Sequence, residues 1–488
     1  MFIKTSHLLC CALLLTAALV SCGQEHDDSK ETVTDSQTTA AVSDAESDTS
    51  SIYHPNLPEA NYNGETFMIL NSNDDTWRMA TSVLSSDESA GDSLNDAIHQ
   101  RNLEVMEKYN IVLEEYLNED GDEIARTAIS SGDDTYDLLL IHRKDLLDLV
   151  LINAVTDWAE IPYIETDKEW WVQGSMQELS IGGKVYFGIS MFDTSHFDSV
   201  YTYYFNKSLI TEYDLSDPYE LVLSGQWTFD RLYEMGMAVA KDMNGDSKWD
   251  EGDRYGISSH AGMFVQAMMG GADAMLTLSK DENDLPVFTL NSEYYITRLQ
   301  KLYDMLYTAD GFVNPFAESS NHGGVDYFMS GNSLFFCETM GNAAQLRSMT
   351  LDFGILPAPK YDEAQTEYYN DGGSPYFMMV PTTNQDLDRT GLLMEALAYA
   401  SMDTVKVAMY DDLLEGKVSR DVESEQMLNI LYSSLSYKIP IAGDIIADDL
   451  SEYLYLKKKN DFASWFAKKE TSIQRQINNA ITAYTENN

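Results

Sequence analysis

The sequence predicts an α/β fold in which strands and helices alternate along the chain. The short apolar runs Glu65–Leu70 and Tyr136–His142 have the length and composition of strands, and the second is apolar enough to be covered on both faces. Between them, Asp92–Tyr109 repeats apolar residues such as Ile98 and Val105 at helical spacing. Strands that alternate with helices form βαβ units with right-handed crossovers.

Similar patterns extend along the rest of the chain. We expect further strands at 110–116, 184–189, 200–205, 333–337 and 376–380. We expect further helices at 123–131, 229–241, 292–307, 389–402 and 461–485. A body of roughly 430 residues is long enough for two or three domains. The chain shows no internal repeat of the kind that solenoid proteins carry.

The first residues resemble a secretion signal that ends in a lipid-attachment motif. Lys4 precedes the apolar run Leu8–Val20, which is too short to span a bilayer and has the length of a signal-peptide core. The run ends in LVSCG (19–23), which resembles a bacterial lipobox. We therefore expect residues 1–21 to be removed and Cys22 to carry the lipid that anchors the chain to the membrane. The alternative is an ordinary signal peptide with a chance cysteine.

An acidic segment rich in Ser and Thr, residues 22–60, follows the signal, with Tyr53 as its one aromatic residue. Such a segment cannot bury enough apolar surface to offset its chain entropy, so we expect a disordered tether. The rest of the chain contains no other apolar run long enough to cross a membrane. The body is therefore expected outside the cytoplasm, held at the membrane by the lipid.

Charge and cysteine content narrow the function. With 80 acidic and 31 basic residues the net charge is −49, a surface that repels nucleic acid and anionic lipid and leaves neutral or cationic ligands open. Of the four cysteines, Cys10 and Cys11 leave with the signal and Cys22 takes lipid. Only Cys337 remains, which we expect to be a small buried residue, so the mature chain forms no intramolecular disulfide.

The stretch DMNGDSKWDEGD (242–253) has the spacing of a twelve-residue calcium loop. The candidate ligands are Asp242, Asn244, Asp246, the backbone carbonyl of Lys248, Asp250 and Asp253. Ser247 stands at position 6, where Gly is usual, and Asp253 at position 12 is shorter than the usual Glu. Because the following RYGI favours a turn and a strand, we expect a structural calcium staple and not a switch. The alternative is a solvated acidic turn.

Four blocks of the chain resemble, in order, bacterial extracellular solute-binding lipoproteins of ABC importers, in the sugar-binding (family 1-like) subgroup. The blocks are SLNDAIHQRNLEVMEKYNIVLEE (93–115), VYTYYFNKSLITEYDLSDPYELVLSGQWTFDRLYEMG (200–236), DFGILPAPKYDEAQTEYYN (352–370) and RTGLLMEALAYAS (389–401). The resemblance implies a type II periplasmic-binding-protein-like fold with two hinged lobes and a ligand cleft between them. It also implies a monomer without an organic cofactor that captures a neutral sugar or oligosaccharide for an ABC permease.

The resemblance further implies that the chain crosses between the lobes three times. The expected crossings are 182–189, 331–338 and 375–383. This would place 61–189 and 336–382 in the N-terminal lobe, and 190–335 and 383–488 in the C-terminal lobe. A ligand would then lie where the crossings meet the loops that follow the strands, the usual position in open α/β sheets.

Candidate ligand-binding residues cluster at these places. The loop after the first strand combines planar polar groups with an aromatic face, as sugar recognition requires. Its candidates are Asn71, Asn73, Asp75, Trp77 and Arg78. At the strand ends and crossings the candidates are His142, Asp193, His196, Glu338, Asn342 and Asp371. The alternative is that these are ordinary structural polar residues, with a polar surface turn at 71–79.

Two other classes of protein stay open. A glycoside hydrolase needs two carboxylates at a defined separation, which a chain with 80 acids can supply. Against an enzyme, the sequence contains no Gly-x-Ser-x-Gly elbow, no His-Glu-x-x-His motif and no phosphate-cradling loop. A cell-surface glycan-binding or adhesin-type protein could also carry a calcium loop, although dockerin-like modules pair two such loops and this chain has one. We therefore expect a binding protein and no catalytic residues.

Overall fold

The computed structural model describes residues 54–73, 83–84, 93–273, 278–314, 324–346, 349–415, 422–437, 441–442, 446 and 449–486. From Pro55 onward these residues belong to one compact unit. The expected signal, Cys22 and most of the tether lie in residues 1–53, outside the described residues, and stay predictions.

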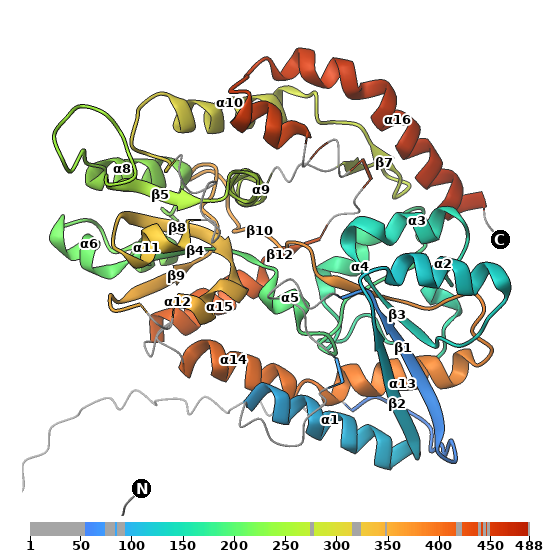
Figure 1. The fold of residues 1–488 in the computed structure, drawn as a ribbon. Coiled ribbons are helices and arrows are strands. Elements are labelled where there is room, and N and C mark those ends of the chain that lie inside the picture. The colour runs from blue at the N-terminus through green and yellow to red at the C-terminus, as the bar shows by residue number, and fades with distance from the viewer. Residues whose placement is uncertain are drawn as a thin grey trace, which may run out of the picture. The chain divides into compact units, whose positions relative to one another are not determined.

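Two four-stranded sheets organise the fold (Figure 1). The first sheet has the order β11-β3-β1-β2 and contains β1 (Glu65–Asn71), β2 (Ile111–Leu117), β3 (Leu138–His142) and β11 (Tyr376–Met379). The second has the order β5-β8-β4-β9 and contains β4 (Tyr201–Asn206), β5 (Tyr255–Ser259), β8 (Ser333–Thr339) and β9 (Phe353–Leu356). Two small pairs join β6 (Ser279–Lys280) to β7 (Pro286–Val287) and β10 (Asn370–Asp371) to β12 (Leu435–Ser436).

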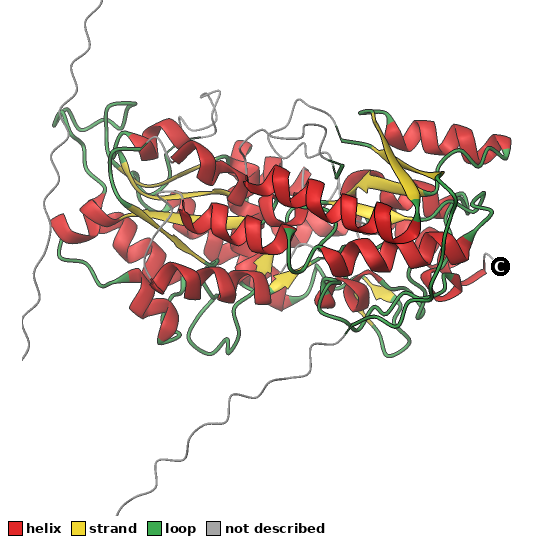
Figure 2. Ribbon diagram, turned by 90° about the horizontal axis from the view of Figure 1, so that it is seen from below, coloured by secondary structure: helices red, strands yellow, loops and turns green. Residues whose placement is uncertain are grey.

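Seen from the side shown in Figure 2, helices cover the strands of the sheets. The longer ones are α1 (Ser93–Tyr109), α2 (Gly121–Ser131), α8 (Phe229–Val239), α9 (Ala261–Gly271), α10 (Glu293–Tyr307), α13 (Leu387–Ala400), α14 (Val405–Glu415), α15 (Val422–Ser433) and α16 (Phe462–Glu486). The shorter ones are η1 (Arg143–Asp145), α3 (Leu146–Leu151), η2 (Trp158–Glu160), α4 (Gln173–Leu179), α5 (Ser195–Asp198), α6 (Lys207–Glu212), α7 (Pro218–Leu223), α11 (Val325–Met329), η4 (Met340–Asn342), α12 (Ala343–Leu346) and η6 (Glu452–Leu456).

Alternate residues of the strands enter different cores, as the two-residue period of a strand requires. In β3, Leu139 faces a core that runs across both sheets, whereas Leu140 faces a second core on the other side of the first sheet. In β4, Tyr203 joins the shared core and Tyr204 faces a third core beside α15. Each sheet is therefore buried on both faces, which explains the continuous apolar runs in its central strands.

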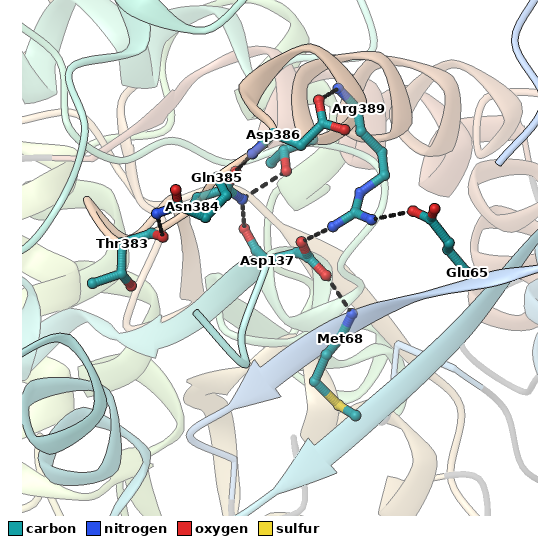
Figure 3. A network of polar contacts seen from close by, with 9 residues as sticks. Glu65, Met68, Asp137, Thr383, Asn384, Gln385, Asp386 and Arg389 are labelled. Atoms are coloured by element: carbon teal, nitrogen blue, oxygen red, sulfur yellow. Dashed lines mark hydrogen bonds and ion pairs between the residues drawn. The ribbon is translucent and has the colours of Figure 1, made fainter. Parts of the chain in front are cut away.

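A polar network fixes the start of α13 against the first sheet (Figure 3). Arg389 donates to the Asp137 carboxylate at 2.5 Å and to the Glu65 carboxylate at 2.9 Å. Asp137 also accepts the N–H of Met68 at 2.8 Å, and its backbone carbonyl accepts Asn384 Nδ2 at 3.1 Å. Burial raises the pKa of Asp137, and the bonds from Met68 and Arg389 oppose that shift. The network thus holds the start of α13 to β1 and to the residue that precedes β3.

The structure confirms most of the elements expected from the sequence, including the strands now labelled β1 to β4, β8 and β11 and the helices α1, α2, α8, α10, α13 and α16. The strand expected at 184–189 is absent from the sheets and is reduced to isolated bridges at Lys184 and Gly188. Gly188 packs so tightly that an added Cβ would lie 2.8 Å from the side chains of both Met176 and Trp158. This segment is therefore a connection and not a strand.

Strand pairing corrects the expected lobe boundaries. Residues 336–382 were expected in the N-terminal lobe, but β8 and β9 pair with β4 in the second sheet. The segment 331–338 is thus not a crossing, because it contributes a central strand to that sheet. The chain returns to the first sheet later, between β9 and β11. Residues 383–488 were expected in the other lobe, yet Leu393 and Leu397 of α13 pack in the core that β1 and β3 share.

Candidate functional site

A cavity of about 350 Å³ lies between the ends of strands from both sheets. Its lining residues are Ser72, Glu119, His142, Lys144, Asp145, Ser195, Ser199, Tyr201, Met263, Thr339, Ser374 and Tyr376. The first sheet contributes the residue after β1, the end of β3 and the start of β11, and the second contributes the start of β4 and the end of β8. The volume falls within the range of about 300–1,000 Å³ that small-molecule sites occupy.

The wall formed by the first sheet is tied together by short polar contacts. Ser72 Oγ accepts the N–H of His142 at 3.0 Å. His142 Nδ1 accepts the N–H of Lys144 at 3.4 Å, and this bond caps the start of η1. The ring of Tyr376 meets the His142 ring edge-on, with centroids 5.5 Å apart, and its hydroxyl donates to Asn73 Oδ1 at 3.4 Å. The strand ends therefore present a hydroxyl, an imidazole and a phenol in fixed positions.

Asn71 and Asn73 are buried behind this wall. Asn71 Nδ2 donates to Glu115 Oε1 at 2.8 Å, while its Oδ1 accepts the N–H of Asn73 at 3.1 Å. The same Glu115 carboxylate accepts the N–H groups of Val83 and Leu84 at 3.2 and 3.1 Å. Glu115 therefore joins Asn71 to Val83 and Leu84, and the candidates Asp75, Trp77 and Arg78, which come between them in the sequence, lie outside the described residues.

The buried Asp193 lies in the first connection between the sheets, the segment between β3 and β4, and supports another part of the cavity wall. The Asp193 carboxylate accepts both the hydroxyl and, at 3.1 Å, the N–H of Ser195. Ser195 Oγ in turn accepts the N–H of Tyr376 at 3.0 Å. His196 Nδ1 bonds the carbonyl of Asp193 at 2.6 Å, and its Nε2 has no hydrogen-bond partner among the described residues. Asp193 thus positions a cavity hydroxyl and does not itself line the cavity.

The second connection between the sheets, the segment between β9 and β11, is held by an ion pair and by close backbone contact. Arg143, directly after β3, donates to the carbonyl of Gly373 at 2.7 Å and lies 3.7 Å from the Asp371 carboxylate. Asp371 accepts the N–H of Gly373 at 2.9 Å. Gly373 has φ +69°, and a Cβ there would lie 2.0 Å from the carbonyl oxygen of Ser199. The two connecting segments therefore touch at a point that only glycine can occupy.

The structure places the sequence-predicted residues at different depths. His142 lines the cavity. Asn71, Asn73, Asp193 and Glu338 each adjoin or hydrogen-bond a lining residue, and Glu338 does so by accepting the N–H of Thr339 at 2.9 Å. Asp371 lies within the segment between β9 and β11, beside Arg143, and the buried His196 directly follows the lining residue Ser195. The side chain of Asn342 is outside the described residues.

Two lining residues stand in the sequence directly beside residues that we predicted for the site. Ser72 and Thr339 directly follow the predicted Asn71 and Glu338 at the ends of β1 and β8. Successive side chains of a strand point to opposite faces, so an error of one residue selects a buried neighbour. Ligands in such folds lie beyond the ends of the strands. This rule would have pointed to both hydroxyl groups if the last residue of each strand had been known.

The acidic loop 242–253 satisfies its carboxylates with backbone amides. Asp242 accepts two N–H groups at 2.6 Å each, and the buried Asp253 accepts two more at 2.7 and 2.9 Å. Ser247 at loop position 6 has φ +66°. Across the part of the chain that the structure describes, no group of three or more His, Cys, Asp or Glu side chains is gathered to hold a metal ion. Asp246 and Asp250 likewise accept backbone N–H groups, those of Lys248 and Gly252, at 2.8 Å each.

The buried Asp193 and His196 predict opposing effects of pH on stability. Burial raises the pKa of Asp193 to about 6, and burial lowers the pKa of His196 to about 4. For Asp193 the stabilising contribution is complete below about pH 4 and is lost as the pH rises through about 6. For His196 it is complete above about pH 6.5 and is lost as the pH falls through about 4.

Replacing Asp193 by Asn should remove one of these contributions and reveal the other. Relative to wild type, the free energy of unfolding of Asp193→Asn should rise by about 2 kcal/mol between pH 4 and pH 7, at about 1.4 kcal/mol for each unit of pKa difference that this pH range covers. Urea denaturation across this range measures the difference. The exposed variant Asp134→Asn controls for the change in net charge. A difference between wild type and Asp193→Asn that stays constant with pH would contradict the prediction.

Comparison with known proteins rests on structure. No protein-family model and no curated protein matches this chain. A sugar transporter from Rhizobium etli in an open conformation matches with a TM-score of 0.54 and 13% identity, over 86% of this chain and 98% of that one. UgpB from Mycobacterium tuberculosis, in complex with glycerophosphocholine, matches with a TM-score of 0.53 and 15% identity, over 85% and 98%.

A cyclo/maltodextrin-binding protein complexed with maltotetraose matches with a TM-score of 0.52 and 14% identity, over 86% of this chain and 96% of that chain. At such identities a likeness establishes the fold alone. The chain therefore has the α/β fold of the periplasmic-binding-protein-like solute-binding proteins, as the sequence predicted.

Proposed function

We propose that this protein captures a neutral sugar or short oligosaccharide outside the cytoplasm and delivers it to an ABC permease. The observation that carries the proposal is the cavity between the two sheets, since its walls come from strand ends of both. Solute-binding sites in open α/β folds occupy this position, where loops converge beyond the strand ends.

The chemistry of the cavity supports a polyhydroxylated ligand. Seven of its twelve lining residues carry a hydroxyl group, which can both donate and accept a hydrogen bond. Tyr201 and Tyr376 add aromatic rings that can pack against the C–H faces of a sugar ring. Lys144 is balanced by Glu119 and Asp145, so the charged lining residues do not favour an anion.

Binding to both walls would couple ligand capture to a change in the angle between the sheets. A ligand that contacts Tyr376 on one wall and Thr339 on the other stabilises the arrangement in which both reach it. Closure can be driven only by this difference in affinity between the two arrangements. The segments around Ser199 and Gly373, where the connections touch, are the natural hinge.

The structural neighbours are consistent with this proposal and show how wide the choice of solute is. One is described as a sugar transporter and another was solved with maltotetraose, whereas UgpB was solved with glycerophosphocholine. One fold therefore serves several kinds of polar solute. For this chain the hydroxyl-rich lining, and not the fold, is what favours a sugar over a peptide or another polar solute.

Loss of an aromatic face should weaken binding. Ligands are first found by a thermal-shift screen of neutral sugars, because a ligand specific to the folded state raises its melting temperature. In calorimetric titration, Tyr376→Leu should then bind on the order of 10- to 100-fold more weakly, a loss of about 1–3 kcal/mol. Trp77→Ala, in the loop predicted to stack on the sugar, should have a similar effect. Tyr163→Leu, which changes an exposed tyrosine that is not among the lining residues, should bind like wild type.

Three outcomes would contradict the proposal. Equal affinity of Tyr376→Leu and wild type would remove the cavity from the binding site. Scattering that shows no compaction at saturating sugar would exclude closure. Recovery of a chemically altered sugar would favour a glycoside hydrolase, since a binding protein returns its ligand unchanged.

We also propose that lipid on Cys22 anchors the protein. The lipobox-like LVSCG (19–23) supports this, and no helix among the described residues has the length and apolar character to span a membrane. Cys22→Ala should leave the protein unprocessed or release it from the membrane fraction. Mass spectrometry of the mature wild-type chain should find diacylglyceryl on Cys22, and an unmodified Cys22 there would overturn the assignment.

We propose calcium as a structural staple of the loop 242–253. The ligand spacing supports it, as does the left-handed backbone of Ser247 at the position where calcium loops turn sharply. Binding requires Asp242, Asp246 and Asp250 to exchange amide hydrogen bonds for the ion.

Calorimetry should detect one calcium ion per chain with a dissociation constant of about 0.1–1 mM, the range of extracellular calcium modules. The ion should raise the melting temperature, and Asp246→Asn should weaken binding. Asp230→Asn, outside the loop, is the matched control. No binding at millimolar calcium would refute the site, and a large calcium-dependent change in scattering would refute the staple role.

A further inference from the structure

A second cavity, of about 520 Å³, shares none of its described lining residues with the first. It lies among α4, the end of α9, the start of α10, β6 and the β10–β12 pair. Its residues include the tyrosines Tyr294, Tyr295 and Tyr369 and the carboxylates of Glu178 and Asp273. Nothing in the function proposed above uses this space.

Fixed aromatic groups form one wall of the second cavity. The hydroxyl of Tyr294 donates to the carbonyl of Asp273 at 2.8 Å, and the guanidinium of Arg298 lies 3.5 Å from the centroid of its ring. Arg298 also donates to the carbonyl of Ala272 at 3.0 Å. Tyr295 meets Tyr294 edge-on, with centroids 5.3 Å apart. The wall is thus held in place by the end of α9, and its order does not depend on a ligand.

The opposite wall is held by Glu178 of α4. Its carboxylate accepts the hydroxyl of Ser436 at 2.7 Å and the N–H of Tyr437 at 2.5 Å. These bonds tie α4 to β12 and keep the Ser436 side chain at the cavity. Both walls are therefore preorganised, which lowers the entropic cost of binding a small molecule.

The backbone of Gly372 separates the two cavities. Its carbonyl accepts the hydroxyl of Ser199, which lines the first cavity, at 2.7 Å. Its N–H donates to the carbonyl of Ser436, which lines the second, at 3.1 Å. A Cβ at this position would lie 2.0 Å from the ring of Tyr437. The chain thus packs tightly between the two spaces, so substitutions in one wall can test that cavity alone.

The lining chemistry selects a class of ligand. Seven of the eleven described lining residues carry a hydroxyl group, and three of those seven are tyrosines whose rings can pack against a sugar face. The other polar groups are two carboxylates, and no Lys, Arg or His stands among these eleven residues. Such a lining satisfies a ligand rich in O–H or N–H donors and repels an anion of the same shape.

We propose that this second cavity binds a polyhydroxylated ring, either an uncharged sugar or one that carries an amine. The site is separate from the cavity between the sheets and does not rest on transport of the ligand held there. Its selectivity differs as well, because the first cavity contains Lys144 and His142 among its lining residues, whereas the charged side chains among the eleven described lining residues of the second are those of Glu178 and Asp273.

Three hexoses of one size test the proposal on the full-length mature protein: glucose, glucosamine and glucuronate. Calorimetry and saturation-transfer spectroscopy are compared for wild type, Tyr295→Leu, Tyr369→Leu and the first-cavity variant Tyr376→Leu. In the Tyr376→Leu background, which weakens the first cavity, binding of glucose or glucosamine should remain detectable, and adding Tyr295→Leu or Tyr369→Leu to that background should weaken it at least tenfold. Glucuronate should bind at least tenfold more weakly than glucosamine. Asp273→Asn should reduce this difference in affinity between the two hexoses, because it removes a negative charge from the lining.

The outcomes separate this site from the first. Hexose binding that is lost in Tyr376→Leu and unchanged in Tyr295→Leu and Tyr369→Leu places all binding in the first cavity and overturns the second site, while the proposed function survives. Equal binding of glucuronate and glucosamine in the Tyr376→Leu background overturns the charge selectivity. No binding of any of the three at millimolar concentration in that background overturns the proposal. Circular dichroism and Tyr163→Leu control for folding and for loss of a tyrosine elsewhere.

Discussion

Close contact between the two segments that connect the sheets is the constraint on which the rest of this structure depends. At Gly373 the backbone passes so near the carbonyl oxygen of Ser199 that no side chain fits, and at Gly372 the ring of Tyr437 leaves equally little room. Arg143 clasps the same segment through the Gly373 carbonyl. Because the first sheet, the second sheet and both cavities meet here, a shift of this contact would alter all of them together.

Three carboxylates near the first cavity hold other groups in place and are not among its described lining residues. Asp193 orients Ser195, Glu338 accepts the N–H of Thr339, and Glu115 joins Asn71 to Leu84. Burying these charges is costly unless they are hydrogen-bonded, and the bonds they accept reduce that cost. The cavity between the sheets therefore presents hydroxyl groups whose directions are set from behind, an arrangement suited to a ligand that is itself covered in hydroxyls.

The likeness to solved solute-binding proteins and the chemistry of the cavities address different questions. At 13–15% identity the structural likeness establishes the architecture and not the ligand, because proteins of this fold were solved with ligands as different as maltotetraose and glycerophosphocholine. The ligand class must come from side chains. Both cavities are rich in hydroxyl groups, but the first mixes Lys144 with Glu119 and Asp145, while the charged groups lining the second are acids. If both sites bind sugars, their discrimination should therefore differ by charge.

Local patterns in the sequence by themselves determined the α/β class and the position of most elements, since helical and strand periodicity depends on near neighbours. Pairing of distant segments decided the rest. Only the tertiary structure showed that β8 and β9 flank β4 and that α13 covers the first sheet. The same limit left unseen that Ser72 and Thr339, the neighbours of the candidates Asn71 and Glu338, line the cavity. Which face of a strand meets the cavity depends on where the chain leaves the sheet, and long-range packing sets that.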